Sequence, residues 1–382
     1  MLEQKFLNYI KTQKLFYADN KILLTVSGGV DSMVMLHLFR RTNFEVGIAH
    51  CNFNLRGDES DRDANFVRLI ARENAIPYFE ESFDTGKFAS DRKCSIQEAA
   101  RELRYSWFEE IKIGGNYQYY ATGHNFDDQL ETFFINLFRG TGVRGLRGIL
   151  PKNGNCIRPL LFATRDEIVE YAKNHNIVFR EDSSNKSDKY LRNRIRHQLL
   201  PALQSVKSDF KTGFEKTFTH LLETEKVIEG DIRKLREKLF SNNEDQIRIP
   251  IDKLTKLQFI EFYLHELLKP FNFNEDVTGK IPAALNKIPG KTFFSKTHQL
   301  IIDRDFLIIS PVDINKPDKY FVDAGAIKIG IPVELNFERL SVTGKIIIDP
   351  DKNVAQFDFD KLKFPLKLRR WEEGDSFHPF GM

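Results

Sequence analysis

The first half of the chain alternates short apolar runs with longer amphipathic stretches. Runs rich in β-branched and aromatic residues occupy 21–26, 44–50, 76–83 and 117–123. Apolar residues recur at three- and four-residue spacing, the period of an amphipathic helix, over 31–41, 59–74, 95–113 and 127–139. This alternation predicts an α/β fold with a doubly wound, mostly parallel sheet. Such sheets bind ligands beyond the carboxyl ends of their strands, so each strand-to-helix junction is a candidate for chemistry.

The pattern changes after residue 182. Two helical stretches, 192–204 and 210–239, follow each other without an intervening strand. The remaining chain predicts a strand at 246–251, a helix near 257–268, and strands at 300–303, 306–310 and 345–349. We therefore predict three domains: an α/β domain over 1–208, a small mainly helical or mixed domain over 209–312, and a linker with the beginning of a β-rich domain over 313–382.

Composition excludes several classes of protein. The 382 residues are 41% hydrophobic and 29% charged, as in an ordinary globular chain, and no apolar run is long enough to span a bilayer. The N-terminus lacks the apolar core of a secretion signal. The three cysteines, Cys51, Cys94 and Cys156, form no CxxC or zinc pattern, which favours a reducing, cytoplasmic location. The net charge of +3 says nothing about where charge is concentrated.

The first strand leads directly into a loop suited to phosphate. Adjacent glycines allow close backbone approach, and the N-terminus of the following helix offers unpaired N–H groups to an anion. The loop has neither the lysine of a Walker A motif nor the spacing of a dinucleotide-binding motif. A plain turn with a Ser or Asp cap is the alternative. Asp31, close to bound phosphates, is the candidate ligand for Mg²⁺. The loop residues are Ser27, Gly28, Gly29, Val30, Asp31 and Ser32.

Two further junctions carry polar side chains toward the same edge. The second strand ends in His50 and is followed by HCNFNLRG, which includes Arg56; a solvated loop is the alternative there. The fourth strand ends in Gly-His-Asn, so His124 and Asn125 precede a helix that begins with acidic residues. Asp128 and Glu131 lie three residues apart, and Asp127 and Glu131 four apart, so these carboxylates share a helix face. They favour a cation-binding role, although acidic residues also simply stabilise a helix N-terminus.

Basic residues are concentrated in three later segments. The first, FRGTGVRGLRG, combines glycines with arginines in what we predict to be a flexible loop suited to phosphates or an RNA backbone. Residues 185–220 hold eight basic and three acidic side chains, and 361–371 hold five basic side chains and no acid, a net +5 in each. Solvated surface is the alternative for each segment. The candidate RNA-binding residues are Arg56, Arg139, Arg144, Arg192, Arg194, Arg196, Arg369 and Arg370.

The motifs carry a resemblance to known families. SGGVDS after a first strand resembles the loop of the N-type ATP pyrophosphatase (PP-loop) superfamily. The ordered set SGGVDS, HCNFNLRG, GHNFDDQLET, FRGTGVRGLRG, RPLL and DSSN…RNRIR is similar to the tRNA(Ile)-lysidine synthetase family over about residues 20–200. Near the end, RWEEGD and PFGM resemble a segment that opens a longer C-terminal domain in that family, so we expect the chain to be part of a longer protein.

The resemblance implies a ligase that uses ATP and Mg²⁺. Its substrate is the tRNA(Ile) with a CAU anticodon, whose wobble cytidine is adenylated at C2 and then attacked by free L-lysine, giving lysidine, AMP and pyrophosphate. The loop, His50 and Asn125 would bind ATP, and the catalytic residues would be Asp31, His124, Asp128 and Glu131. Of these, Asp128 and Glu131 would hold the lysine amine and accept its proton. The later domains would bind tRNA, and a homodimer is the default assembly.

Three alternatives stay open from the sequence. A PP-loop tRNA thiolase needs catalytic or cluster-binding cysteines, typically as CxxC, and Cys51 has no partner in the sequence. Amidating relatives such as NAD⁺ or GMP synthetases lack the LRG and RNRIR segments. A non-catalytic tRNA-binding relative would tolerate the loss of Asp31, Asp128 and Glu131, yet all three are present.

Overall fold

A computed structural model describes residues 2–55, 57–180, 188, 190–243, 246–285, 290–312, 319–330, 334–341, 351 and 353–369. The chain divides into two compact units, Met1–Asp231 and Ile232–Met382. Arg56, Arg370 and the predicted strand 345–349 lie outside the described residues. Within the described ranges, no helix combines the length and the apolar character that crossing a bilayer requires.

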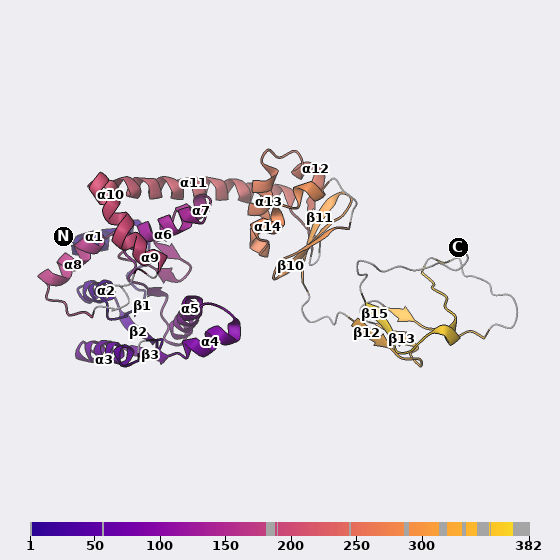
Figure 1. The fold of residues 1–382 in the computed structure, drawn as a ribbon, viewed down its shortest axis with the longest axis horizontal. Coiled ribbons are helices and arrows are strands. Elements are labelled where there is room, and N and C mark those ends of the chain that lie inside the picture. Colours follow the sequence, from indigo (N-terminus) through magenta and orange to yellow (C-terminus); the bar gives the residue numbers. More distant parts are fainter. Residues whose placement is uncertain are drawn as a thin grey trace. The chain divides into compact units, whose positions relative to one another are not determined.

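The first unit contains the predicted α/β sheet (Figure 1). Its six strands have the order β3-β2-β1-β4-β6-β5, and all neighbours pair in parallel except β5 and β6. The strands are β1 (Ile22–Thr25), β2 (Val46–Asn52), β3 (Tyr78–Ser82), β4 (Tyr119–Ala121), β5 (Lys152–Asn153) and β6 (Cys156–Ile157). Because β2 and β4 flank β1 on opposite sides, the strand order reverses at β1, which is where open α/β sheets form their ligand crevice.

Helices cover both faces of this sheet. The helices of the first unit are α1 (Leu2–Thr12), α2 (Val30–Arg40), α3 (Asp58–Glu73), α4 (Thr85–Arg92), α5 (Ile96–Gly114), α6 (Phe126–Phe138), α7 (Val143–Leu146), α8 (Arg165–Asn174), α9 (Leu191–Arg194), a π-helical turn (Ile195–Leu199), α10 (Leu200–Val206) and α11 (Phe210–Leu239), which continues past Asp231 into the second unit. The predicted helices 31–41, 59–74, 95–113, 127–139 and 210–239 are confirmed within a few residues. The helices α1 and α4 were not predicted.

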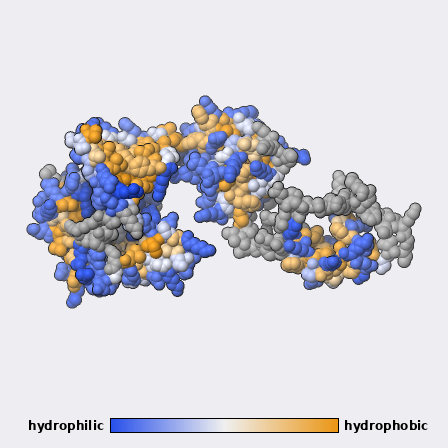
Figure 2. Space-filling view, in the orientation of Figure 1, coloured by the Kyte–Doolittle hydropathy of each residue, from blue (hydrophilic) through white to orange (hydrophobic). Residues whose placement is uncertain are grey.

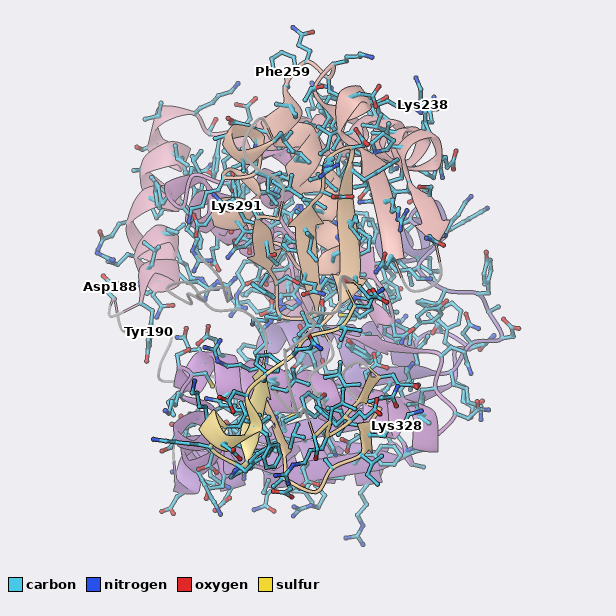
Figure 3. The ribbon with its side chains drawn as sticks, turned by 90° about the vertical axis from the view of Figure 1, so that its right-hand side faces the viewer. Asp188, Tyr190, Lys238, Phe259, Lys291 and Lys328 are labelled. Carbon is cyan, nitrogen blue, oxygen red and sulfur yellow. The ribbon has the colours of Figure 1, made fainter. Side chains whose placement is uncertain are left out.

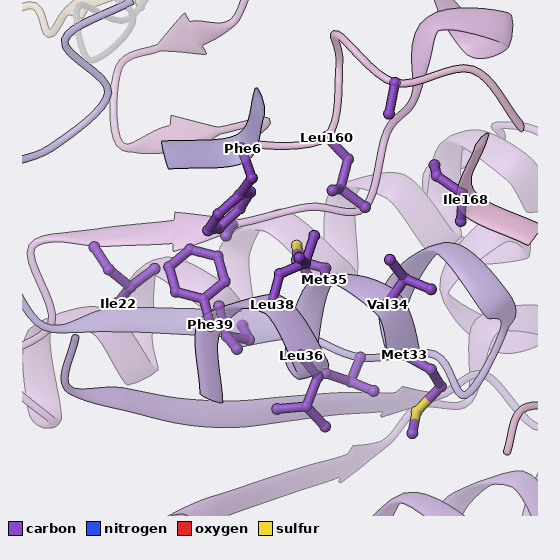
Figure 4. Packing of buried hydrophobic residues seen from close by; sticks show 14 of the residues in the cluster. Phe6, Ile22, Met33, Val34, Met35, Leu36, Leu38, Phe39, Leu160 and Ile168 are labelled. Atoms are coloured by element: carbon purple, nitrogen blue, oxygen red, sulfur yellow. The ribbon is translucent and has the colours of Figure 1, made fainter. Parts of the chain in front are cut away.

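The core follows from the two-residue period of β1. Ile22 and Leu24 pack with α1, α2 and α8 on one face, where Phe6, Phe39 and Ile168 are buried (Figure 4). Leu23 points to the other face and packs with Phe108 and Ile111 of α5. Successive side chains of a strand point to opposite faces, so a strand that is apolar throughout needs cover on both sides. The run ILLT therefore fits a central parallel strand.

A third apolar cluster joins α6 to the helices that follow the sheet. Its buried members are Phe126, Leu130, Phe134, Ile195, Leu200, Phe210 and Phe218. Figure 2 shows hydrophobic residues gathered around α10 and the N-terminal part of α11. Phe126, Leu130 and Phe134 follow each other at four-residue spacing, which places them on one face of α6. The cluster holds the π-helical turn and α10 against α6.

The second unit contains an antiparallel sheet with the order β7-β8-β11-β10-β9. Its elements are β7 (Ser241–Asn243), β8 (Gln246–Pro250), α12 (Ile251–Leu254), α13 (Ile260–Leu268), a 3-10 turn (Lys269–Phe271), α14 (Glu275–Thr278), a 3-10 turn (Pro282–Ala284), β9 (Thr292–Phe294), β10 (His298–Ile302) and β11 (Phe306–Pro311). Phe259, 71% exposed, extends outward just before α13 (Figure 3). Between Ser241 and Pro311 the described part of the second unit therefore mixes helices and strands.

Short antiparallel pairs make up the described part of the last segment. Strand β12 (Lys319–Val322) pairs with β15 (Leu366–Arg369), and β13 (Lys328–Ile329) pairs with β14 (Leu335–Asn336). A 3-10 turn, Phe359–Lys361, precedes β15. The predicted β-rich character of this segment is confirmed for the described residues.

Candidate active site

The loops that follow β1 and β4 meet at the point where the strand order reverses. Gly123, just after β4, packs so tightly on the start of α2 that a Cβ built on it would lie 3.2 Å from the Ser32 nitrogen. A larger residue at Gly123 would push the two loops apart. The two junctions that the sequence singled out are therefore adjacent in space.

The SGGVDS loop has the backbone geometry of an anion site. Gly28 has a φ of +90°, a conformation that L side chains rarely adopt. The Ser32 hydroxyl donates to the Gly29 carbonyl oxygen over 2.8 Å, and the Ser27 N–H donates to the Ser32 oxygen over 3.2 Å. Gly29, the N-cap of α2, provides no side chain to cap the first turn. The N–H groups of that turn are thus available to a phosphate.

His50 supports this loop from the neighbouring strand. The side chain is 4% exposed, and Nδ1 lies 2.8 Å from the carbonyl oxygen of Val26, the residue before Ser27. A carbonyl oxygen can only accept, so Nδ1 carries the proton and donates it. Burial lowers the pKa of His50, which favours the neutral ring. His50 therefore contacts the backbone that leads into the loop.

Asp31 is the first acidic group of the site. Its Oδ1 accepts a hydrogen bond from Asn125 Nδ2 over 2.9 Å, and its Oδ2 forms a close ion pair with Arg165, the first residue of α8. Burial raises the pKa of Asp31, and the charge of Arg165 opposes that increase. These three side chains, Asp31, Asn125 and Arg165, are called the Asp31 group below.

The donor set at Asp31 fits one protein ligand of a magnesium ion that is brought by a nucleotide. Among the described residues, no cluster of three or more His, Cys, Asp or Glu side chains has the geometry of a metal site. Mg²⁺ in nucleotide-using enzymes is commonly held by one or two carboxylates, substrate phosphates and water. Asp31, 22% exposed and partly desolvated, supplies such a carboxylate.

A second acidic group lies on the first two turns of α6. Glu131 has no exposed surface; its Oε1 accepts from Arg196 Nε over 2.7 Å, and its Oε2 lies 3.2 Å from Arg192 Nε. Asp128 is 17% exposed, and its Oδ1 lies 3.7 Å from Arg196. Burial and the nearby charge of Asp128 raise the pKa of Glu131, and the two arginines oppose this. These four side chains, Asp128, Glu131, Arg192 and Arg196, are called the Glu131 group below.

The start of α6 is fixed by a capping box. The Asn125 side chain accepts from the Asp128 N–H over 3.1 Å, and the Asp128 carboxylate accepts from the Asn125 N–H over 3.0 Å. Asn125 thus links the two acidic groups, because its amide nitrogen also donates to Asp31. A capping box satisfies two orphan N–H groups at a helix start, which fixes the direction of both side chains.

Asp127 takes a different direction from its two acidic neighbours. Its Oδ2 accepts from the Arg165 backbone N–H over 2.7 Å, and its Oδ1 pairs with Lys211 of α11 at 2.7 Å. Four-residue spacing predicts that the Asp127 and Glu131 carboxylates lie on one helix face. In the structure the two carboxylates instead turn to different partners. Asp127 joins α6 to α8 and α11.

His124 is held in its neutral form. Its Nδ1 lies 2.8 Å from the Thr122 hydroxyl. Burial, together with the positive charges of Arg158, Arg192, Arg104 and Arg101, lowers the pKa of His124 to about 3. A neutral imidazole can orient a substrate through a hydrogen bond but cannot deliver a proton as an imidazolium at neutral pH.

The predicted flexible basic loop is an ordered turn. Gln129 of α6 donates from Nε2 to the Arg147 carbonyl oxygen over 3.0 Å and accepts from the Ile149 N–H over 2.5 Å. Asn136 donates to the Gly145 carbonyl oxygen over 2.7 Å. The prediction of flexibility was wrong because it counted glycines and could not see these side-chain contacts from α6.

The candidate RNA-binding arginines differ in their surroundings. Arg139 and Arg194 are exposed, whereas Arg144 pairs with Glu225 at 3.3 Å and lies 3.9 Å from Glu229. Arg147 pairs closely with the same Glu225. Arg369 lies on β15. RNA binding by these residues stays a prediction, as do the roles of the loop, His50, His124, Asp128 and Glu131.

Sequence reasoning missed Arg165 and Lys211 as parts of the site. Thr164 and Glu167 form the capping box that the motif TRDE predicts. That signal places Arg165 at the first position of a helix, four residues after the end of RPLL, but it does not show which carboxylate the side chain meets. The partners are 134 residues apart for Arg165 and Asp31 and 84 apart for Lys211 and Asp127.

Cys51 and Cys156 lack the properties of a sulfur-transfer site. Burial raises the pKa of Cys51 to about 12 and also raises the pKa of Cys156. A thiol of such high pKa is a poor source of thiolate at neutral pH. The geometry gives no support to the thiolase alternative.

Two family models match the chain: PP-loop domain over residues 1–203 and TilS substrate binding domain over residues 242–312. A tRNA(Ile)-lysidine synthase from Parabacteroides distasonis is 39% identical over 98% of this chain and 85% of its own length. One from Bacteroides thetaiotaomicron is 36% identical over 100% and 86%. The U34-tRNA thiolase NcsA from Methanococcus maripaludis is 18% identical, with a TM-score of 0.48 over 58% of this chain and 80% of that structure. On these sequence matches, the chain belongs to the tRNA(Ile)-lysidine synthase family of PP-loop proteins.

Proposed function

We propose that this ligase adenylates the wobble cytidine of tRNA(Ile) bearing a CAU anticodon and then transfers free L-lysine to it. In the first step the cytosine O2 attacks the α-phosphorus of ATP, and the bond to pyrophosphate breaks. In the second step the lysine ε-amine attacks C2, and AMP leaves. The supporting observation is that the phosphate loop and two carboxylate groups meet at one sheet edge, joined through Asn125.

The first step requires stabilisation of negative charge on the phosphates. The SGGVDS loop supplies hydrogen-bond donors for this purpose. They are the N–H groups at the start of α2 and the hydroxyls of Ser27 and Ser32. Asp31 would hold Mg²⁺, and the ion when bound would neutralise charge that develops on the phosphoryl oxygens. His50 keeps the loop in position from behind through the Val26 carbonyl.

The second step requires an amine without its proton at neutral pH. We assign Asp128 as the carboxylate that meets the lysine amine, because it is the more exposed member of the Glu131 group. Glu131, wholly buried, holds Arg196 and Arg192 in place. A carboxylate within hydrogen-bond reach both orients the amine and accepts its proton. His124, kept neutral, orients the base or the adenylate.

RNA binding uses positively charged surface beside the site. Arg192, which pairs with Glu131, and the exposed Arg194 both lie on α9. An unpaired anticodon base is accessible to an enzyme without opening a duplex, which suits a site at an open sheet edge. The second unit, matched by the substrate-binding model, would contact other parts of the tRNA.

Incorporation of labelled lysine tests the proposal. The chain is incubated with ATP, Mg²⁺, labelled L-lysine and a tRNA(Ile) transcript bearing the CAU anticodon, and the nucleosides are identified by mass spectrometry. We expect label in lysidine, dependent on ATP. A methionine tRNA with the same anticodon is the specificity control, and Asp128→Asn the matched catalytic control. Incorporation of sulfur, or lysine-independent release of the adenylated tRNA as the final product, would contradict the proposal.

A further inference from the structure

The N-termini of three helices are tied together at the Asp31 group. Asp31 is the second residue of α2, Asn125 is the N-cap of α6, and Arg165 is the first residue of α8. Asn125 and Arg165 both contact the Asp31 carboxylate, and the Arg165 N–H binds Asp127 of α6. The positive ends of three helix dipoles therefore face one small volume beside the phosphate loop.

Arg165 is held at its backbone, and its side chain is partly exposed. The N–H is fixed at 2.7 Å from Asp127, whose other oxygen binds Lys211. The side chain is 41% exposed, while its partner Asp31 is 22% exposed. A guanidinium on such a fixed base can exchange one oxyanion for another by rotation of its side chain, since carboxylate and phosphate offer it the same bidentate geometry.

The ion pair between Arg165 and Asp31 is incompatible with a metal ion bound at Asp31. Asp31 already accepts a hydrogen bond from Asn125, so Arg165 occupies the oxygen that a metal ligand would have to offer. If Asp31 binds the metal ion that accompanies ATP, Arg165 loses its carboxylate in the same event. The freed guanidinium then lies beside the phosphate loop, where the phosphates of a nucleotide offer it a new anion.

We propose that Arg165 is a further catalytic residue, which leaves Asp31 when ATP binds and contacts the β- and γ-phosphates that depart as pyrophosphate. This rests on the proposed ATP-dependent adenylation. In that step the cytosine O2–phosphorus bond forms, the bridging oxygen–phosphorus bond breaks, and its electron pair leaves with pyrophosphate. Arg165 stabilises the charge that collects there.

The alternative is that Arg165 only neutralises a partly buried Asp31. That role needs a cation at position 165 but no contact with ATP. The two roles predict different nucleotide affinities when Arg165 is replaced. A contact with the departing phosphates affects the affinity for ATP but not for AMP, because AMP has the adenosine and the α-phosphate but lacks those two phosphates.

Calorimetry with ATP and AMP, with and without MgCl₂, tests the assignment on the full chain. We expect Arg165→Gln to weaken ATP binding at least tenfold in the presence of MgCl₂ and to change AMP binding less than twofold. Lys173→Gln, which removes the same charge from the exposed far end of α8, is the matched control and should change neither. Arg165→Lys keeps the charge without the fork and should fall between wild type and Arg165→Gln.

The outcomes are decisive without the tRNA reaction. Unchanged ATP affinity in Arg165→Gln, or an equal loss of affinity for ATP and AMP, would overturn the assignment of Arg165. Neither result would count against the proposed formation of lysidine. If Arg165→Gln unfolds, the double variant Asp31→Asn/Arg165→Gln removes both charges; restored folding with ATP affinity equal to that of Asp31→Asn alone would also overturn it. Failure of lysine incorporation with normal ATP binding would instead count against the proposed function.

Discussion

The Asp31 group and the Glu131 group are two solutions to the same problem, a carboxylate placed beside arginine at a helix start. Asp31 keeps part of its surface exposed and shares its oxygens between one amide and one arginine. Glu131 has no exposed surface and binds two arginines. An ion pair that remains partly solvated can exchange partners at low cost, whereas a fully buried pair cannot lose one member without leaving a buried charge.

The difference assigns separate tasks to the two groups. The Asp31 group can release its arginine and accept a substrate-borne cation. The Glu131 group is a rigid support, and the partly exposed Asp128 at its rim is the part that a substrate amine can reach.

Asp31→Asn should cause the largest loss. The amide cannot replace the carboxylate toward a metal ion, so adenylation should slow by about 100- to 1000-fold. Pyrophosphate release in a single turnover with tRNA(Ile) measures this step. The control is Asp166→Asn, which changes a neighbouring acidic residue in the first turn of α8. Normal pyrophosphate release from Asp31→Asn would break the distinction between the two groups.

Asp128→Asn should affect the lysine step and spare the ATP step. Loss of the proton acceptor should slow lysine transfer about 100-fold, with pyrophosphate release within a few-fold of wild type. Quenched-flow separation of adenylated tRNA from lysidine provides the measurement. Glu131→Gln should also slow transfer, because Arg196 loses its anion, but should raise the KM for lysine less than Asp128→Asn does. The reverse order in KM would show that Glu131 meets the amine.

Two candidate RNA-binding arginines differ in their partners, because Arg139 is exposed and Arg144 pairs with Glu225. Arg139→Gln should weaken tRNA binding a few-fold and reduce the slope of log K against log salt by about one, as the loss of a phosphate contact does. Arg144→Gln should change that slope less, because Glu225 already neutralises Arg144. Filter binding at several salt concentrations measures both. Equal slopes in the two variants would mean that the Glu225 pairing does not persist in the complex.

The smallest effect concerns the dependence of stability on pH. Burial raises the pKa of Glu131 above its value in the unfolded chain, so the folded state binds the proton more tightly. The stabilisation from this group is complete below the unfolded pKa and is lost as pH rises through the folded pKa. The free energy of unfolding of wild type minus that of Glu131→Gln should therefore fall as pH rises from about 4 to 8. Urea unfolding at several pH values tests it; a difference that grows with pH would contradict the shift.

Local pattern predicted the elements well, because helical periodicity and capping are short-range properties. Helix 210–239 coincides with α11, and the spacing of Thr164 and Glu167 in TRDE is that of the capping box found in α8. The partners inside the site could not be predicted the same way. Spacing placed Asp127 on a face with Glu131, but Asp127 turns to α8 and α11, and only the packing of distant helices decides that. Glycine content likewise suggested a flexible loop that Gln129 holds in place.

The first turns of α6 have a consequence for how the protein folds. Polar side chains between Asn125 and Glu131 bind several other elements. Asn125 binds α2, Asp127 binds α8 and α11, and Gln129 binds the turn at Arg147. Glu131 binds the arginines of α9 and the π-helical turn. No one of these elements can complete the site alone, so its geometry arises only when all of them have docked. Amide hydrogens in this turn should then exchange with solvent through opening of the whole first unit, and catalytic competence should return at the last step of refolding.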